Sequence, residues 1–396
     1  MDTRRAADVA APTGRIDALT GVRILAAAAV FLSHVGAPAF APAPVAAFAS
    51  AGYNGVTLFF VLSGFVLAWN YTDRLARPTG RALWSFAVAR FARIYPLYLF
   101  ALVFAAAPLL VNGIPSTIGL HVLAVQTWHP SMMVANSYNG PGWSIGVELF
   151  LYACFPLLVL AMRGIRTRPR VLLAVAALAV AISFSLAWWF VATGRAATIP
   201  VTEGGSAHRW LYRTPVTRLG DFTLGIIAAW LIRSGRAAPR LGAIAQAVGA
   251  ISMVALMADP RMLWSTWSWD AAYMVPVVLL LWGLAASPGT WLARFLGSRP
   301  MVAAGEASFA FYLLHLPLLG LLHIEAPPTW AAWAFITGLM FVMVLLVAVG
   351  AHVAIERPAQ RWIRRTLDHK RRDMAEDPAP VELAERVLVS VTPPGT

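Results

Sequence analysis

Two ionisable residues lie within the first long apolar run of the chain, and both could take part in acid–base or charge-stabilising chemistry. Arg23 and His34 are eleven residues apart in a run over residues 20–38. At 100° per residue they return to within about 20° of each other on a helix, separated by about 16 Å along its axis. An imidazole inside a membrane helix is a candidate general base. The alternative is a structural histidine that is hydrogen-bonded in the bundle interior.

A carboxylate is expected at a depth similar to that of His34. The segment WSIGVELF begins another apolar run and contains Trp143, Ser144 and Glu148. A buried carboxylate must be protonated or paired. We therefore expect Glu148 to pair with His34 and to orient its ring. An interhelical structural hydrogen bond is the alternative for Glu148.

A polar stripe lies in a late apolar run, in the segment GEASFAFYLLHLP. Ser308, Tyr312 and His315 follow one another at i, i+4 and i+7, which places them on one face of a helix. Polar residues of this kind commonly join membrane helices. The alternative is that these three side chains line a substrate path.

The segment RFARIYP carries Arg90 and Arg93 at i and i+3, so both guanidiniums share a helix face. They either bind a diphosphate or are ordinary basic residues at the inner end of a span.

The small residues Gly55, Ser63 and Gly64 lie in another apolar run and are interpreted as helix-packing residues. Ser63 has no nucleophile-elbow motif around it, so a hydrolase nucleophile is not expected there.

The composition indicates what must position these residues. Of the 396 residues, 59% are hydrophobic and 12% charged, with a mean hydropathy of +0.68. A soluble domain has roughly 25% charged residues, so soluble, disordered and disulfide-stapled classes are excluded. The chain has one cysteine, and no P-loop, zincin or dinucleotide motif occurs in it. The expected fold class is an all-α, polytopic membrane helical bundle.

Ten apolar runs are long enough to be spans. They cover residues 20–38, 53–70, 91–110, 143–162, 171–192, 216–232, 241–257, 269–286, 301–323 and 330–354. A further apolar segment at 117–128 is too short to span, and we expect it to be re-entrant or interfacial. With ten spans and the first 17 residues inside, 25 basic residues fall on inner segments and four on outer ones. This asymmetry predicts that both termini are cytoplasmic in a bacterial inner membrane.

The predicted organisation has three parts. Residues 1–17 form a cytoplasmic segment, residues 18–358 the membrane domain, and residues 359–396 a cytoplasmic tail. The tail is expected to begin as a basic amphipathic helix on the inner leaflet and to end disordered. The net charge of +13 reflects loops that face the membrane, so no nucleic-acid partner is expected.

Taken together, these motifs resemble the acyltransferase-3 family of integral membrane O-acyltransferases, over roughly residues 18–358. The matching elements are the R-x10-H of Arg23 and His34, FFVLSGF at 59–65, R-x-x-R at Arg90 and Arg93, W-S-x-x-x-E at Trp143, Ser144 and Glu148, G-x-x-S-F-x-x-Y-x-x-H from Gly305 to His315, and E-R-P at Glu356 to Pro358.

The resemblance implies transfer of an acyl group, usually acetyl, from acyl-CoA to a hydroxyl of a sugar or cell-envelope glycan. Arg90 and Arg93 would hold the donor phosphates. His34 would act as general base, Glu148 would orient it, and Arg23 would stabilise the donor or the developing charge. Trp143, Ser144, Ser308, Tyr312 and His315 would line the substrate path. No metal and no tightly bound cofactor is expected, and acyl-CoA is the donor substrate.

Two other functions fit the same residues. The acceptor could be a macrolide or a similar secondary metabolite. Alternatively, buried His and Glu residues could form the proton relay of a secondary transporter. Transporters tend to contain inverted repeats and broken helices, which the sequence does not display.

Overall fold

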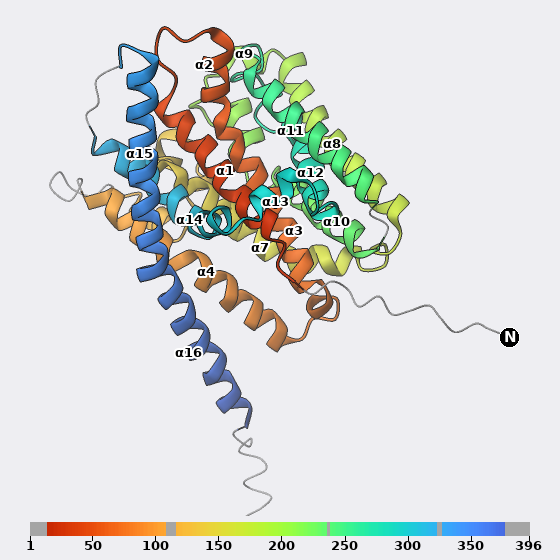
Figure 1. The fold of residues 1–396 in the computed structure, drawn as a ribbon. Helices are drawn as coiled ribbons and strands as arrows, with labels where there is room; N and C mark the ends of the chain where they lie inside the picture. The colour runs from red at the N-terminus through yellow and green to blue at the C-terminus, as the bar shows by residue number, and fades with distance from the viewer. Residues whose placement is uncertain (1–13, 108–115, 236–237, 323–326, 377–396) are drawn as a thin grey trace, which may run out of the picture.

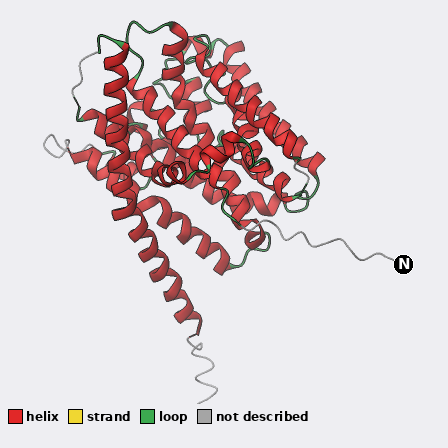
Figure 2. Ribbon diagram, viewed as in Figure 1, coloured by secondary structure: helices red, strands yellow, loops and turns green. Residues whose placement is uncertain are grey.

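The computed structural model describes residues 14–107, 116–235, 238–322 and 327–376. Every regular element in these ranges is a helix, which confirms the expected fold class (Figures 1 and 2). Each of the ten predicted spans corresponds to a helix. The ten are α1 (Asp17–Val35), α3 (Gly55–Leu75), α4 (Gly80–Ala106), α7 (Trp143–Met162), α8 (Pro169–Ala192), α10 (Leu219–Arg233), α11 (Pro239–Ala258), α12 (Ala271–Ala286), α14 (Arg299–Gly320) and α15 (Trp330–Ala351).

Eight of these helices are long and apolar enough to cross a membrane. The exceptions are α10 and α12, with 15 and 16 residues, which is below the roughly 20 that a bilayer requires. Both begin next to buried charged residues, because Arg218 and Asp270 are the residues that precede them. The chain is therefore a multi-pass helical membrane protein whose two shortest central helices start within the protein interior.

Short elements connect the long ones. Residues 117–128 contain a five-residue helix, α5 (Ile118–Val122), and a 3-10 turn, η3 (Gln126–Trp128), so the expectation that they do not span is confirmed. The remaining short elements are α2 (Ala43–Ser50), η1 (Ala51–Asn54), α6 (Met132–Ala135), η4 (Gly140–Gly142), α9 (Arg195–Thr198), the π-helical turn η5 (His208–Arg213) and α13 (Trp291–Leu296).

Two close helix contacts form the centre of the bundle: α1 against α14, and α3 against α10. At Gly305 of α14, an added Cβ would lie 2.0 Å from the carbonyl oxygen of Thr20 on α1. At Gly64 of α3, it would lie 2.0 Å from that of Phe222 on α10. Only glycine allows backbones to approach so closely, which confirms the packing role predicted for Gly64. By contrast, α8 and α15 are apolar and largely exposed, as lipid-facing helices are.

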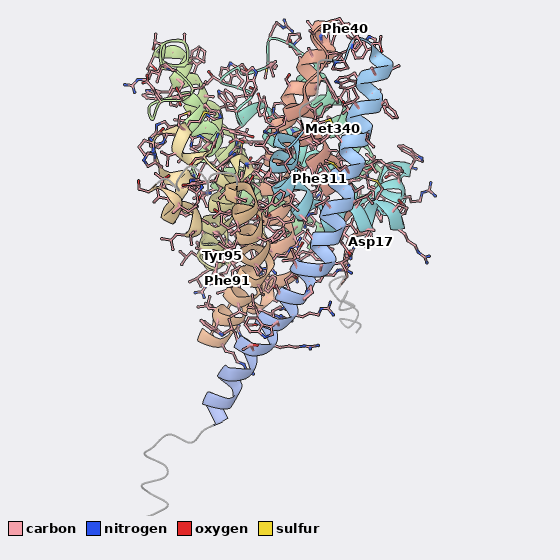
Figure 3. All side chains as sticks on the ribbon, turned by 90° about the vertical axis from the view of Figure 1, so that its left-hand side faces the viewer. Asp17, Phe40, Phe91, Tyr95, Phe311 and Met340 are labelled. Atoms are coloured by element: carbon pink, nitrogen blue, oxygen red, sulfur yellow. The ribbon has the colours of Figure 1, made fainter. Side chains whose placement is uncertain are left out.

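A π-helical turn, η6 (His352–Glu356), joins α15 to the long basic helix α16 (Arg357–Glu376). In Figures 1 and 3, α16 continues in the direction of α15 and extends beyond the bundle. Its residue Ile363 packs on Val88 and Ala92 of α4, so the predicted amphipathic helix covers another helix of the protein. Residues 377–396, predicted to be disordered, lie outside the described residues. We call the end of the bundle near Asp17 the basic end, and the end near Phe40 the far end (Figure 3).

Candidate active site

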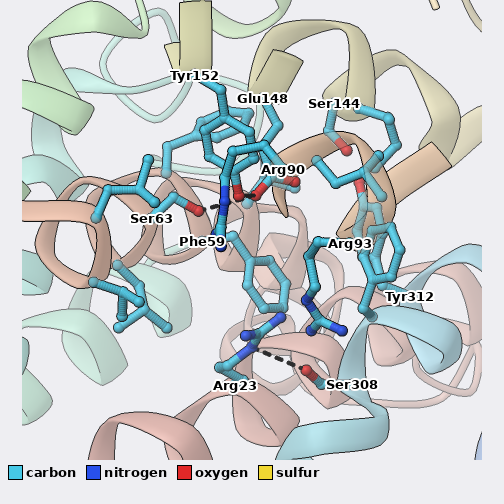
Figure 4. Close-up of a pocket in the computed structure, with 18 residues that line it drawn as sticks. Arg23, Phe59, Ser63, Arg90, Arg93, Ser144, Glu148, Tyr152, Ser308 and Tyr312 are labelled. Carbon is cyan, nitrogen blue, oxygen red and sulfur yellow. Dashed lines mark hydrogen bonds between the residues drawn. The ribbon is translucent and has the colours of Figure 1, made fainter. Parts of the chain in front are cut away.

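A cavity of about 190 Å³ lies among α1, α3, α4, α7 and α14 (Figure 4). Four of these helices contribute polar or charged side chains that were selected from the sequence. Apolar residues such as Phe59 and Ile94 complete the walls. The predicted site residues that line this central cavity are Arg23, Arg90, Arg93, Ser144, Glu148, Ser308 and Tyr312.

Arg23 and Ser308 connect α1 and α14, which pack closely around Gly305. Arg23 Nε donates a hydrogen bond to Ser308 Oγ over 3.2 Å (Figure 4). The Ser308 hydroxyl in turn donates to the Gly305 carbonyl over 2.7 Å. The Arg23 guanidinium is therefore anchored at one end while it faces the cavity. It is placed to stabilise negative charge there.

Glu148 pairs with α3 and with its own helix. Its Oε1 accepts hydrogen bonds from Ser63 Oγ, over 3.1 Å, and from the Tyr152 hydroxyl. The predicted pair between Glu148 and His34 is therefore wrong, because α7 turns its carboxylate towards α3. The interpretation of Ser63 as packing alone is also wrong, since its hydroxyl lines the cavity.

Arg90 and Arg93 lie one turn apart on α4 and face the same cavity, as their spacing predicted. Arg90 Nη2 donates to the Tyr71 hydroxyl over 3.0 Å, and its guanidinium lies over the Tyr152 ring. Arg93 forms an ion pair with Glu356 and lies over the Phe309 ring. With Arg23, three guanidiniums and one carboxylate line the cavity, so its lining carries an excess of positive charge.

A second cavity, of about 420 Å³, lies at the basic end. Arg15, Glu306 and Trp69 belong to its lining. It shares Arg23, Val66 and Arg93 with the central cavity, so the two meet at these side chains. The pair offers a basic path from the basic end towards the middle of the bundle.

His34 and His315 lie beyond the central cavity, towards the far end. Their rings are in edge contact, with centroids 5.0 Å apart. His34 Nδ1 lies 2.9 Å from the Val30 carbonyl oxygen and 3.4 Å from His315 Nε2. His315 Nδ1 lies 2.7 Å from the Tyr312 carbonyl oxygen. Since a carbonyl can only accept, both histidines carry a proton on Nδ1.

This assignment leaves the Nε2 lone pair of His34 free, as a general base requires. His34 is exposed at the end of α1, whereas His315 is fully buried. Neither histidine lines the central cavity. Tyr312 separates them from it, because its ring lines the cavity and lies 5.9 Å from the His315 ring.

Trp143 is also absent from the cavity lining, although Ser144 beside it is present. Its buried ring packs against Tyr212, at a centroid distance of 4.8 Å, and against Phe60. The structure therefore gives Trp143 a packing role behind the cavity wall. Among the described residues, no group of three His, Cys, Asp or Glu side chains could hold a metal ion.

Sequence reasoning missed a buried ion cluster. The Arg218 guanidinium is fully buried and donates to Asp221, over 3.0 Å, and to Asp270, over 2.5 Å. It also donates to the carbonyl oxygens of Tyr212 and Trp269, each over 2.8 Å. Asp221, three residues after Arg218 in an apolar run, was the available signal. The cluster fixes the starts of α10 and α12.

Sequence comparison identifies the family of the chain. Residues 16–352 match the family model described as an acyltransferase domain. The chain is 30% identical to acyltransferase MdmB of Streptomyces mycarofaciens, over 92% of this chain and 96% of MdmB. It is 21% identical to peptidoglycan O-acetyltransferase OatA of Listeria monocytogenes, over 80% of this chain but only 52% of OatA. No solved structure matches the chain. The chain thus belongs to the acyltransferase-3 family of integral membrane O-acyltransferases.

Proposed function

We propose that this O-acyltransferase moves an acyl group, with acetyl the expected one, from acyl-CoA to a hydroxyl of a sugar or cell-envelope glycan. One observation carries the proposal: two connected cavities lead from the basic end to Tyr312, and the His34–His315 pair lies directly beyond it. The name of OatA supports an acetyl group and a glycan acceptor, although the chain spans about half of that relative.

The donor would enter from the basic end. Arg15, Arg23 and Arg93 line the second cavity, and guanidiniums bind phosphate groups through paired charge-assisted hydrogen bonds. The pantetheine arm would then extend past Arg23 and Arg93 into the central cavity. There its thioester would reach Tyr312, which lies between the central cavity and the histidine pair.

The acceptor would approach from the far end, where His34 is exposed. In the proposed step, Nε2 of His34 takes the proton of the acceptor hydroxyl while the oxygen attacks the thioester carbonyl. The carbon–sulfur bond breaks, and the departing thiolate takes up the proton from His34. Arg23 lies about 16 Å from His34 along the axis of α1, so it would bind the donor within the central cavity and would not contact the reacting carbonyl. The Val30 carbonyl and His315 Nε2 would both accept from Nδ1 of His34 and so stabilise the transient imidazolium.

We propose that the basic end faces the cytoplasm of a bacterial inner membrane, because basic residues are in excess in the segments at this end. Both termini would then be cytoplasmic, where acyl-CoA is found. The orientation is tested with a fluorescent reporter that folds only in the cytoplasm, fused after Thr396. Fluorescence is expected, and its absence would place the C-terminus in the periplasm.

The reaction is tested with the purified protein in detergent micelles, supplied with acetyl-CoA and a panel of glycan and small-molecule hydroxyl acceptors. Acceptor-dependent release of CoA, with acetyl ester on the acceptor, is expected. His34→Ala should lose this activity by about 100-fold or more, the usual contribution of a general base. His129→Ala removes a histidine outside the site and is the matched control. Full activity of correctly inserted His34→Ala would exclude the proposed base.

A further inference from the structure

Arg93 is held by the turn that joins α15 to α16. Glu356 ends this turn, and its side chain is only 1% exposed. Its carboxylate forms an ion pair with the Arg93 guanidinium. Because Arg93 lines both cavities, this pair fixes a cation at the junction between them.

The carboxylate of Glu356 is itself held by two neighbours on its own helix. His352 Nδ1 lies 2.8 Å from Oε2, and Gln360 Nε2 donates to Oε1 over 3.0 Å. Arg357 Nε donates to His352 Nε2 over 3.0 Å. Since a guanidinium can only donate, His352 is neutral and carries its proton on Nδ1, which donates to Glu356.

A second ion chain holds the turn against the rest of the basic end. Arg357 Nη2 donates to Glu306 of α14 over 2.7 Å, and Glu306 also pairs with Arg15. The turn is π-helical, a geometry that is rare and frequent at functional sites. The orientation of Glu356 is thus determined by contacts on several sides, which a surface carboxylate would not need.

A buried carboxylate next to a path for an anionic donor is electrostatically unfavourable for that donor. The Glu356 carboxylate must therefore help donor binding in another way that outweighs this repulsion. A long, flexible arginine loses conformational freedom when it is held in one position, and binding is stronger when that loss has occurred before the ligand arrives. The contacts of Glu356 supply this preorganisation.

We propose that Glu356 is a positioning residue of the donor site, which orients Arg93 to receive a phosphate group of a coenzyme A thioester. The inference rests on the proposed function, because it assigns Glu356 to donor recognition. It predicts that Glu356 acts only through Arg93, and that the acceptor side of the reaction does not depend on it.

The test measures the affinity of coenzyme A for the purified full-length protein in micelles by titration calorimetry, together with the KM for acetyl-CoA and for the acceptor. Glu356→Ala is expected to weaken coenzyme A binding about tenfold and to raise the donor KM equally, with the acceptor KM unchanged. In an Arg93→Ala background, Glu356→Ala should change the affinity by less than twofold, since the two effects are not additive when one residue acts through the other.

Asp73→Asn is the matched control, because Asp73 is a carboxylate that pairs with Arg166 and Arg233 at the same end but lines neither cavity. It should leave coenzyme A binding unchanged. If Glu356→Ala does not fold, Glu356→Gln is used with the same criteria and a smaller expected loss, since its amide oxygen can still accept from Arg93.

An unchanged or stronger affinity for coenzyme A in the folded Glu356 variant would overturn the inference, as would additive losses in the double variant. Those results leave the proposed function intact. Failure of the proposed function is recognised in the unsubstituted protein. That protein would then either bind coenzyme A without transferring an acyl group, or not bind coenzyme A.

Discussion

The imidazole rings of His34 and His315 contact each other edge to face, with His34 Nδ1 3.4 Å from His315 Nε2. The two residues are 281 positions apart and lie on α1 and α14, the helices that pack around Gly305. One ring is exposed and the other fully buried. The buried ring therefore supports the exposed one, while the Val30 carbonyl fixes the tautomer of His34.

Replacement of His315 should lower kcat without affecting donor binding. His315→Leu fills a similar space with an apolar side chain and removes the second acceptor of the Nδ1 proton of His34, leaving the Val30 carbonyl as the first. A hydrogen bond to a charged group contributes about 1.5–3 kcal/mol, so kcat should fall at least about tenfold. Steady-state kinetics with acetyl-CoA would measure this, with the donor KM staying within twofold. An unchanged kcat would show that the buried ring does not support catalysis.

Tyr312 is expected to separate the donor cavity from the exposed histidine. Its hydroxyl donates a long hydrogen bond, over 3.3 Å, to the Pro141 carbonyl oxygen, so Tyr312→Phe should retain most activity. Tyr312→Ala removes the ring between the cavity and His315 and should admit water. Release of CoA without acceptor should then rise several-fold, as a thiol-detecting assay would report. Equal background hydrolysis in the alanine and phenylalanine variants would argue against a separating role.

The buried cluster around Arg218 should contribute strongly to stability. Arg218→Met leaves Asp221 and Asp270 buried without their cation, and loss of one partner of a buried ion pair costs about 3–5 kcal/mol. Thermal unfolding in micelles, followed by circular dichroism, should show a clearly lower midpoint. Arg261→Met removes an exposed arginine paired with Asp259 and should leave the midpoint unchanged. Similar midpoints for the two variants would refute the assignment.

Stability should fall in mild acid because of His208, which lies in the π-helical turn between α9 and α10. Burial, together with the nearby Arg213 and Arg218, lowers the pKa of His208 to about 3. The unfolded chain therefore binds a proton at a higher pH than the folded one. The contribution of neutral His208 is complete above about pH 6.5 and is lost as the pH falls from there towards 3. His208→Gln should reduce the drop in thermal midpoint between pH 7 and pH 4.5; an identical drop would contradict this.

Much of the site was accessible from the sequence, because the relevant information is local. Helical periodicity placed Arg90 on the same helix face as Arg93, and Ser308 on the same face as Tyr312. In the structure both members of each pair line the central cavity. Periodicity also placed Arg23 and His34 on one face of α1, yet Arg23 lines the cavity and His34 lies beyond it. The axial separation was correct, but the position at which the cavity ends depends on Tyr312, a residue of another helix.

The sequence determined that the chain is a helical membrane protein, through the lengths of its apolar runs and its hydropathy. In lipid, the backbone N–H and C=O groups must form hydrogen bonds within their own segment, which a helix allows. Partners across helices could not be derived in this way, because sequence fixes the depth of a residue but not the direction in which its helix is turned. That direction depends on which glycines allow close approach. Only the tertiary structure therefore decided that Glu148 binds Ser63, that Glu356 binds Arg93, and that His315 is the partner of His34.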